Sequence, residues 1–132
     1  MAKQTVQQKT FEEYSLDELT LLTSFWHRDR GITANGTVQM QFIKFVEESG
    51  ELAAAIAKKK PDELKDAIGD CLVLLNIIAE LSDTSLKECW NHAYQEIKDR
   101  KGFLLSNGNF IKDSDPRYEE IVQKDIDENK RS

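Results

Sequence analysis

The stretch KFVEESGELAAAIAKKKPDELKDAIGD, residues 44–70, decides the fold of this chain. Its apolar residues recur near helical spacing on both sides of a lysine run and a proline, so it predicts two consecutive helices. Residues three or four apart share one face of a helix. If the two helices run antiparallel, the acids of the stretch can converge on one point: Glu47, Glu48, Glu51, Asp66 and Asp70.

A cluster of carboxylates needs a counter-charge, because like charges repel and their desolvation is costly. Hard oxygen ligands with room for water and phosphate suit Mg²⁺, with Mn²⁺ as an alternative. We expect Gly50 and Gly69 to let the two backbones approach closely. The competing interpretation is a solvated acidic face, with Lys44 or a downstream basic run neutralising an inward Asp70. The pattern alone leaves both interpretations open.

Capping signals predict one further helix on each side of this pair. The S-x-x-E sequences at 15–18 and 85–88 are capping boxes. The first opens a helix that carries Trp26. The second opens a helix that ends at the basic run 98–101, with Gly102 as its C-cap.

The two central helices are expected over about 38–59 and 61–81, because lysines and a proline separate them. The second is apolar nearly all round, so we expect it to be buried on most sides. Residues 27–37 hold two glycines and predict a loop, whereas an Asn-Gly in 103–112 predicts a hairpin. The fold class is therefore all-α, a four-helix unit with a short C-terminal hairpin or extension.

The 132 residues favour a single domain, 1–132, with 1–10 and about 122–132 as flexible ends. An apolar content of 39% is low for a lone monomer and suits a helical protomer that shares a core with a partner.

The net charge of −6 does not favour binding to nucleic acid, which is itself negatively charged. Cys71 and Cys89 are expected to be buried, reduced thiols. No signal peptide or run of ~20 apolar residues is present, so no membrane association and a cytoplasmic location are expected.

Residues K-F-V-E-E-S-G-E-L, followed by D-A-I-G-D and an apolar helix, resemble the MazG-like branch of the all-α nucleoside triphosphate pyrophosphohydrolases. That superfamily is identified by E-E-x-x-E and then E-x-x-D on two consecutive helices. The resemblance covers about residues 25–102. It implies a helical fold that assembles as a homodimer or homotetramer. It also implies magnesium-dependent hydrolysis of a nucleoside triphosphate to the monophosphate and pyrophosphate.

The resemblance also implies roles for the acids. Glu48 and Glu51 match metal ligands of the first motif, and Asp70 matches the final acid of the second. Glu47 is a candidate for polarising the attacking water, and Glu48 is counted with it as catalytic.

One position departs from the family pattern. The acid expected three residues before Asp70 falls on Ala67. Asp66, one residue earlier, keeps the same helical face, so it is a candidate ligand directly or through a water.

Six residues are candidate contacts for the nucleotide. In the resembling family, basic residues after the fourth helix contact phosphate and aromatic residues before the metal helix stack on the base. A polar residue in an apolar helix could contact ribose or base, or pair across a dimer. The candidates are Lys44, Trp26, Asn76, Lys98, Arg100 and Lys101. Each has an alternative as a solvated helix-end cation or a packing residue.

The expected function is hydrolysis of nucleoside triphosphates to keep the nucleotide pool in order. Two alternatives stay close to it, a phosphoribosyl-nucleotide pyrophosphohydrolase and a nucleotide-binding helical protein with weak or no catalysis. The departure at Ala67 keeps the second of these open. A helical interaction module with a solvated acidic face is the remaining alternative.

Overall fold

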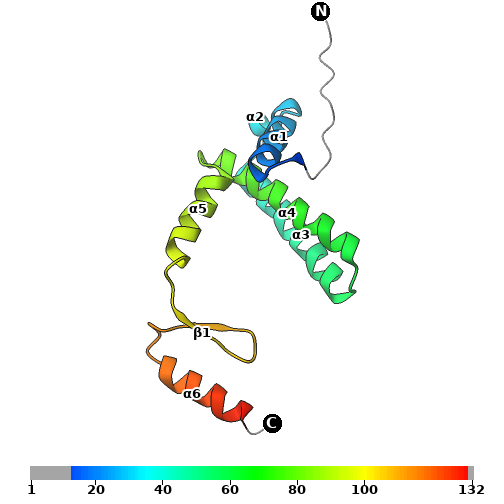
Figure 1. Cartoon of the computed structure of the whole chain (residues 1–132). Helices are drawn as coiled ribbons and strands as arrows, with labels where there is room; N and C mark the ends of the chain where they lie inside the picture. The colour runs from blue at the N-terminus through cyan, green and yellow to red at the C-terminus, as the bar shows by residue number, and fades with distance from the viewer. Residues whose placement is uncertain (1–12, 131–132) are drawn as a thin grey trace, which may run out of the picture. The chain divides into compact units, whose positions relative to one another are not determined.

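The computed structural model describes residues 13–130. The chain divides into two compact units, and the boundary between them in the sequence falls between Trp90 and Asn91. The described residues are mostly helical, with six helices and a two-stranded sheet (Figure 1). None of these helices is long and apolar enough to cross a membrane. The expected polar arm, residues 1–10, lies outside the described residues.

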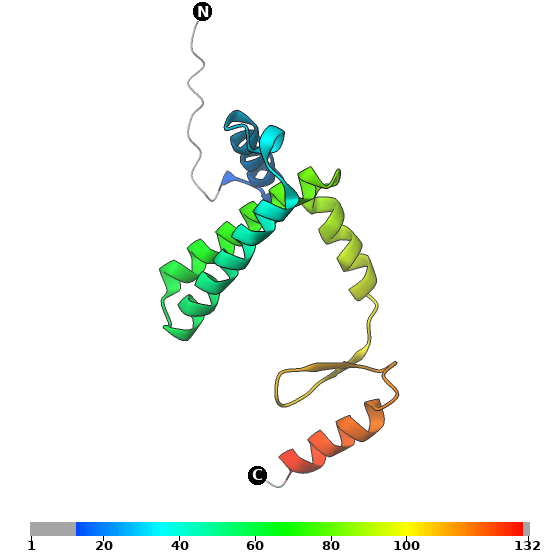
Figure 2. The ribbon, with the colours of Figure 1, turned by 180° about the vertical axis from the view of Figure 1, so that it is seen from behind.

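The first unit is built on a pair of long helices. α3 and α4 lie side by side along their length (Figures 1 and 2), while α1 and the short α2 pack against each other and against α4. The bounds of its helices are α1 Leu16–Asp29, α2 Ile32–Asn35, α3 Val38–Ala57, α4 Pro61–Leu81 and, continuing into the second unit, α5 Leu86–Ile97.

Local sequence signals account for these helix ends. Both halves of the capping box of Ser15 and Glu18 are formed. Thr37 caps α3 by accepting a hydrogen bond from the backbone N–H of Met40 at 3.2 Å. Pro61 occupies the first turn of α4. The expected bounds of the central helices are therefore confirmed to within two residues.

The segment expected to be a loop, 27–37, is more ordered than the sequence predicted. α1 continues through its first residues, and α2 occupies its middle. Gly31 supplies the left-handed conformation between them, with φ of 72°. The side chain of Asn35 then donates a hydrogen bond to the Gly31 carbonyl, which closes the short helix.

The apolar core of the described residues is small. Ile77 is the largest side chain that is fully buried, and Ala67 and Ala79 of the same helix, α4, are also buried. Large apolar side chains of α4 remain exposed, among them Leu72 and Leu75. The expectation that this helix is buried on most sides is therefore wrong within one chain. Cys71 is buried as expected, whereas Cys89 is exposed.

The second unit contains the expected hairpin. β1 (Gly102–Leu104) pairs antiparallel with β2 (Phe110–Lys112), with Phe103 opposite Ile111. Gly102 begins this strand and does not cap a helix, because its backbone is in register with Lys112.

The end of the chain also differs from the expectation. Tyr118–Asn129 form a helix, α6, where the sequence predicted a flexible segment from about residue 122. The carboxylate of Asp125 accepts hydrogen bonds from the backbone N–H and hydroxyl of Ser106, at 3.1 and 2.8 Å. These bonds tie the helix to the hairpin loop, a tertiary contact that charge composition does not reveal.

Candidate functional site

The helix pair α3–α4 brings the two acidic motifs together. The chain reverses at residues 58–60, where Lys59 adopts a left-handed conformation with φ of 53°. The first half of α4, with Asp66 and Asp70, therefore lies against the second half of α3, which carries Glu51. This is the antiparallel arrangement that the sequence predicted.

Glu48 has a carboxyl group whose pKa is raised by its surroundings. Its side chain is half-buried, and Oε2 is buried without a hydrogen-bond partner. Burial raises the pKa of this carboxyl group, and the negative charges of Glu51 and Asp70 raise it further. Glu51 is also close enough to share a hydrogen bond with Glu48 when one of the two is protonated.

Asp70 adds a carboxyl group from the other helix. Burial raises its pKa, followed by the charges of Asp66 and Glu51. Glu51 and Asp70 therefore act on Glu48, and Asp66 and Glu51 act on Asp70. The two helices thus bring these acids near one another, while their convergence on one point and their role as ligands stay predictions.

The donor set of this cluster fits a hard divalent cation, which prefers carboxylate oxygens. The unpartnered Oε2 of Glu48 is an atom that such a cation would satisfy. Within residues 13–130, no three His, Cys, Asp or Glu side chains are arranged as a finished metal site. Binding of a metal here therefore requires some of the carboxylates to rotate.

The position of Ala67 explains why an acid is difficult to place there. Ala67 is 3% exposed, because its side chain packs in the core of the first unit. A carboxylate at this point would lose its hydration. Asp66, in contrast, is exposed on the same helix and contributes to the field at Asp70.

The expected role of the glycines is wrong. A Cβ atom added to Gly50 or to Gly69 would meet no atom within 4 Å. Neither residue therefore lies at a close approach of the two backbones within this chain.

Lys44 and Glu47 form an exposed ion pair beside the cluster. The Lys44 ammonium lies 3.1 Å from a carboxylate oxygen of Glu47. Both side chains remain accessible to solvent, so this pair is available to an incoming ligand. The predicted contacts of Lys44 with phosphate and of Glu47 with water stay predictions.

The other candidate contacts have different surroundings. Trp26 is 47% exposed, and the guanidinium of Arg30 lies over its ring, 4.2 Å from the centroid. Asn76 is buried and donates hydrogen bonds to the Thr20 carbonyl and the Ser24 hydroxyl of α1, at 3.3 and 3.0 Å. Asn76 thus holds α1 on α4, and its predicted contact with substrate is not tested.

The basic residues after the fourth helix are exposed and belong to the second unit. They are Lys98, Arg100 and Lys101, and their predicted contact with phosphate likewise stays a prediction.

Sequence reasoning missed Arg30 and Glu80. Arg30 stands four residues after Trp26, a spacing that brings the two side chains together on a helix and its end. Glu80 has a buried, unpartnered Oε2. No signal in the sequence distinguishes it from the solvated acids near it, because its burial depends on the packing of α1 and α2.

The first unit thus belongs to the class of all-α units that carry acids on two consecutive helices. Comparison with known families makes this more specific: residues 38–102 match the MazG nucleotide pyrophosphohydrolase domain. The segment runs from the start of α3 to the first residue of β1 and contains all five acids. This segment of the chain therefore belongs to the MazG nucleotide pyrophosphohydrolase domain family.

A phage protein is also similar to part of the chain. It is described as an uncharacterized 18.2 kDa protein in the rep-hol intergenic region of Haemophilus phage HP1, and it is 51% identical over 55 residues. The matched part covers 42% of this chain and 34% of the phage protein. This chain therefore spans about a third of that relative. No solved structure matches the chain.

Proposed function

We propose that this protein hydrolyses nucleoside triphosphates to the nucleoside monophosphate and pyrophosphate in a metal-dependent reaction. The observation that supports the proposal most is the approach of Glu48, Glu51 and Asp70 within the segment that matches the family. Hydrolysis between the α and β phosphates requires neutralised charge and an oriented water. A cation held by the cluster would neutralise phosphate charge, and a carboxylate of the cluster would orient the water.

The acids divide into two roles in this proposal. Glu48, Glu51 and Asp70 hold Mg²⁺ (or Mn²⁺), with Asp66 as a further ligand. The bound metal supplies charge neutralisation at the phosphates and acidifies water. Glu47 stands beside Glu48 at the exposed rim, where its carboxylate would polarise the attacking water, and Glu48 is counted with it as catalytic.

The remaining candidates bind the nucleotide. Lys44 contacts phosphate by exchanging its ion pair with Glu47 for a more highly charged partner. Trp26 stacks on the base, with Arg30 as its neighbour. Asn76 is the candidate for a contact with the sugar or base, beside its hydrogen bonds to α1, and Lys98, Arg100 and Lys101 are the basic candidates for binding phosphate.

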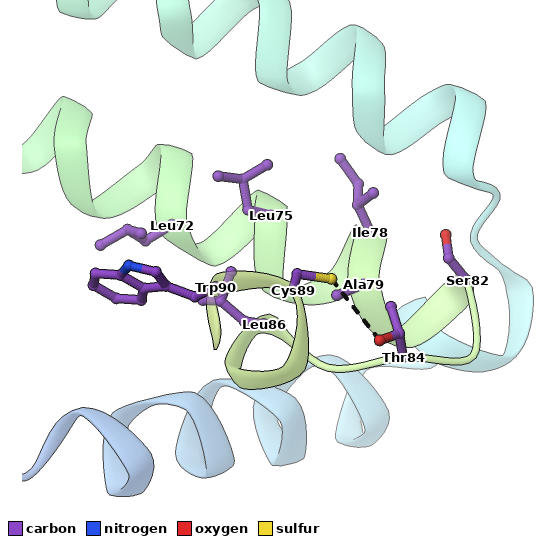
Figure 3. Close-up of a pocket in the computed structure, with 9 residues that line it drawn as sticks. All are labelled: Leu72, Leu75, Ile78, Ala79, Ser82, Thr84, Leu86, Cys89 and Trp90. Carbon is purple, nitrogen blue, oxygen red and sulfur yellow. Dashed lines mark hydrogen bonds between the residues drawn. The ribbon is translucent and has the colours of Figure 1, made fainter. Parts of the chain in front are cut away.

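We further propose that the protein is a homodimer or homotetramer in the cytoplasm. The exposed apolar side chains of α3 and α4 support this proposal. An apolar groove of about 460 Å³ also opens between α4 and the start of α5 (Figure 3). Leu72, Leu75 and Trp90 line it, and a second helical chain could cover it.

Product identification tests the activity. The protein is incubated with a panel of ribo- and deoxyribonucleoside triphosphates and Mg²⁺, with EDTA as the metal-free control. We expect pyrophosphate and monophosphate, and their loss in Asp70→Asn. Glu63→Gln is the matched control, because Glu63 is an exposed acid of α4 paired with Lys60 at 2.8 Å. Orthophosphate as the product, or no product from any nucleotide, would overturn the proposal.

The second candidate function is nucleotide sensing without turnover. The absence of an acid at Ala67 favours it, because one oxygen donor of the family pattern is missing. Tight binding of a triphosphate that is recovered intact would support sensing over hydrolysis.

A further inference from the structure

Three buried polar atoms without hydrogen-bond partners lie on the three helices α1, α2 and α4, which contact one another. They are His27 Nδ1, Thr33 Oγ1 and Glu80 Oε2. Among such atoms in residues 13–130, the fourth is Glu48 Oε2 of the carboxylate cluster. Buried polar groups in native proteins almost always have a partner. We name the place of the first three the α1–α2–α4 junction.

Packing of the helices brings these residues together. The hydrogen bond from Asn76 to Ser24, at 3.0 Å, fixes α1 against α4. His27 is one turn after Ser24, and Glu80 is one turn after Asn76, so both continue the same line of contact. The short helix α2 contacts both α1 and α4, and Thr33 lies on it with its hydroxyl buried. His27 is only 2% exposed.

The junction contains a hydrogen-bond acceptor, Glu80, and a hydrogen-bond donor, His27. Burial lowers the pKa of His27, and the negative charge of Glu80 opposes this only in part, so the imidazole is neutral at pH 7. A neutral imidazole carries one N–H, which either ring nitrogen can hold. An ionised Glu80 can only accept hydrogen bonds, whereas the Thr33 hydroxyl can donate or accept.

A nucleobase with an amino group beside an unprotonated ring nitrogen would complement Glu80 as acceptor and His27 as donor. Cytosine and adenine present such an edge, whereas uracil and hypoxanthine present a carbonyl beside an N–H. The distance also suits a nucleotide, because Glu80 follows Asp70 by ten residues, about 15 Å along a helix. This is the scale of an extended nucleoside triphosphate, with its phosphates at the carboxylate cluster.

Resting on the proposed function, we propose that the α1–α2–α4 junction reads the base of the substrate. Glu80 accepts a hydrogen bond from the exocyclic amino group, and neutral His27 donates one to the adjacent ring nitrogen. The Thr33 hydroxyl supplies a further polar contact. The substrates are therefore cytosine or adenine nucleotides. A carbonyl in place of the amino group would face the Glu80 carboxylate, which leaves both acceptors unsatisfied.

Binding of uncleavable nucleotides tests this inference separately from hydrolysis. Isothermal calorimetry with Mg²⁺ compares α,β-imido analogues in two matched pairs, dCTP with dUTP and ATP with ITP. We expect the amino-bearing member of at least one pair to bind about 10-fold more tightly or more. Glu80→Gln brings the ratio close to one, because an amide can also donate to a carbonyl. Glu63→Gln, an exposed change on the same helix, leaves the ratio unchanged.

Equal binding within both pairs by the unmodified protein would overturn the inference, as would an unchanged ratio in folded Glu80→Gln. If thermal unfolding shows that Glu80→Gln does not fold, Thr33→Val replaces it, and unchanged affinity for the amino-bearing analogue then overturns the inference. Failure of the two proposals is distinguishable. A binding preference without pyrophosphate release refutes hydrolysis alone, whereas pyrophosphate release with equal binding refutes base reading alone. No binding of any analogue refutes both.

Discussion

At the scale of single residues, the Glu48 carboxylate destabilises the metal-free fold and is a proposed ligand of the metal. Its carboxylate is partly buried beside Glu51 and Asp70, and one of its oxygens has no partner. A protein gains nothing in stability from such a group. Metal binding would turn the same arrangement from repulsive to attractive.

We therefore expect Glu48→Gln to have opposite effects on stability and activity. The metal-free variant should unfold at a higher temperature than the unmodified protein, because the amide removes one of the repelling charges. Its rate of pyrophosphate release should fall by about 10²-fold or more. Scanning calorimetry with EDTA measures the first effect. Glu47→Gln is the control for stability alone, because Glu47 is exposed and paired with Lys44. A lower unfolding temperature of Glu48→Gln would contradict this account of the cluster.

The pH dependence of stability follows from the raised pKa values of Glu48 and Asp70. A carboxyl group with a raised pKa in the folded state binds protons more tightly there than in the unfolded chain. Its destabilising effect is full above the folded pKa and disappears below the unfolded value of about 4. The contribution of these two groups to metal-free stability should therefore rise as pH falls from 7 toward about 5.

Double substitution isolates this contribution. The gain in unfolding temperature between pH 7 and pH 5 should be smaller in the variant that combines Glu48→Gln with Asp70→Asn. An equal gain in both proteins would show that other groups cause it. In the unmodified protein, Mg²⁺ should raise the unfolding temperature at pH 7.

The sequence predicted the helix pair that carries the acids because i, i+4 spacing and the lysine-proline break are local signals. Other properties of the site depend on tertiary packing. Gly50 and Gly69 suggested a close approach that does not exist, because each has open space beside it. The burial of Ala67 explains the departure from the family pattern only once the core is known. His27 and Glu80 become a pair only through the packing of α1 on α4.

At the scale of elements, α1 is held on α4 by a buried polar contact. Asn76 donates to Ser24 and to the Thr20 carbonyl at the same place. A capping box predicted α1, and the lysine-proline break predicted the start of α4, but neither signal predicted this contact. The helix α6 shows the same limit, because the bonds of Asp125 to Ser106 link segments that are distant in sequence.

We expect Asn76→Ala to weaken the packing of α1. Loss of hydrogen bonds at a buried position should lower the free energy of unfolding by about 1–3 kcal/mol. If Asn76 acts on packing alone, KM for the nucleotide should change little at a temperature where the variant is folded. Urea denaturation and steady-state kinetics measure the two effects. A large rise in KM with unchanged stability would instead assign Asn76 to substrate binding.

At the scale of the whole molecule, a single chain leaves many large apolar side chains exposed to water, which is unfavourable. Trp90 and Leu72 lie in the apolar groove (Figure 3), and further large side chains are exposed along α3. The low apolar content of the sequence predicted a shared core, but the groove itself could be located only from the packing of α4 and α5.

We expect Leu72→Lys to weaken self-association, because a charge in the groove would have to be desolvated at an interface. Sedimentation velocity should show the unmodified protein as a dimer or tetramer and the variant shifted toward monomer. Leu104→Lys is the matched control, because Leu104 is an exposed leucine of the hairpin, outside the groove. A monomeric unmodified protein would contradict the proposed assembly.

The central claim is that the carboxylate cluster of α3 and α4 cleaves nucleoside triphosphates between the α and β phosphates. Phosphorus NMR of a reaction with Mg²⁺ follows both products directly, with the unmodified protein and Glu48→Gln compared at equal concentration. We predict equal amounts of monophosphate and pyrophosphate from the unmodified protein and almost none from Glu48→Gln. Diphosphate and orthophosphate as products, or equal rates from the two proteins, would contradict it.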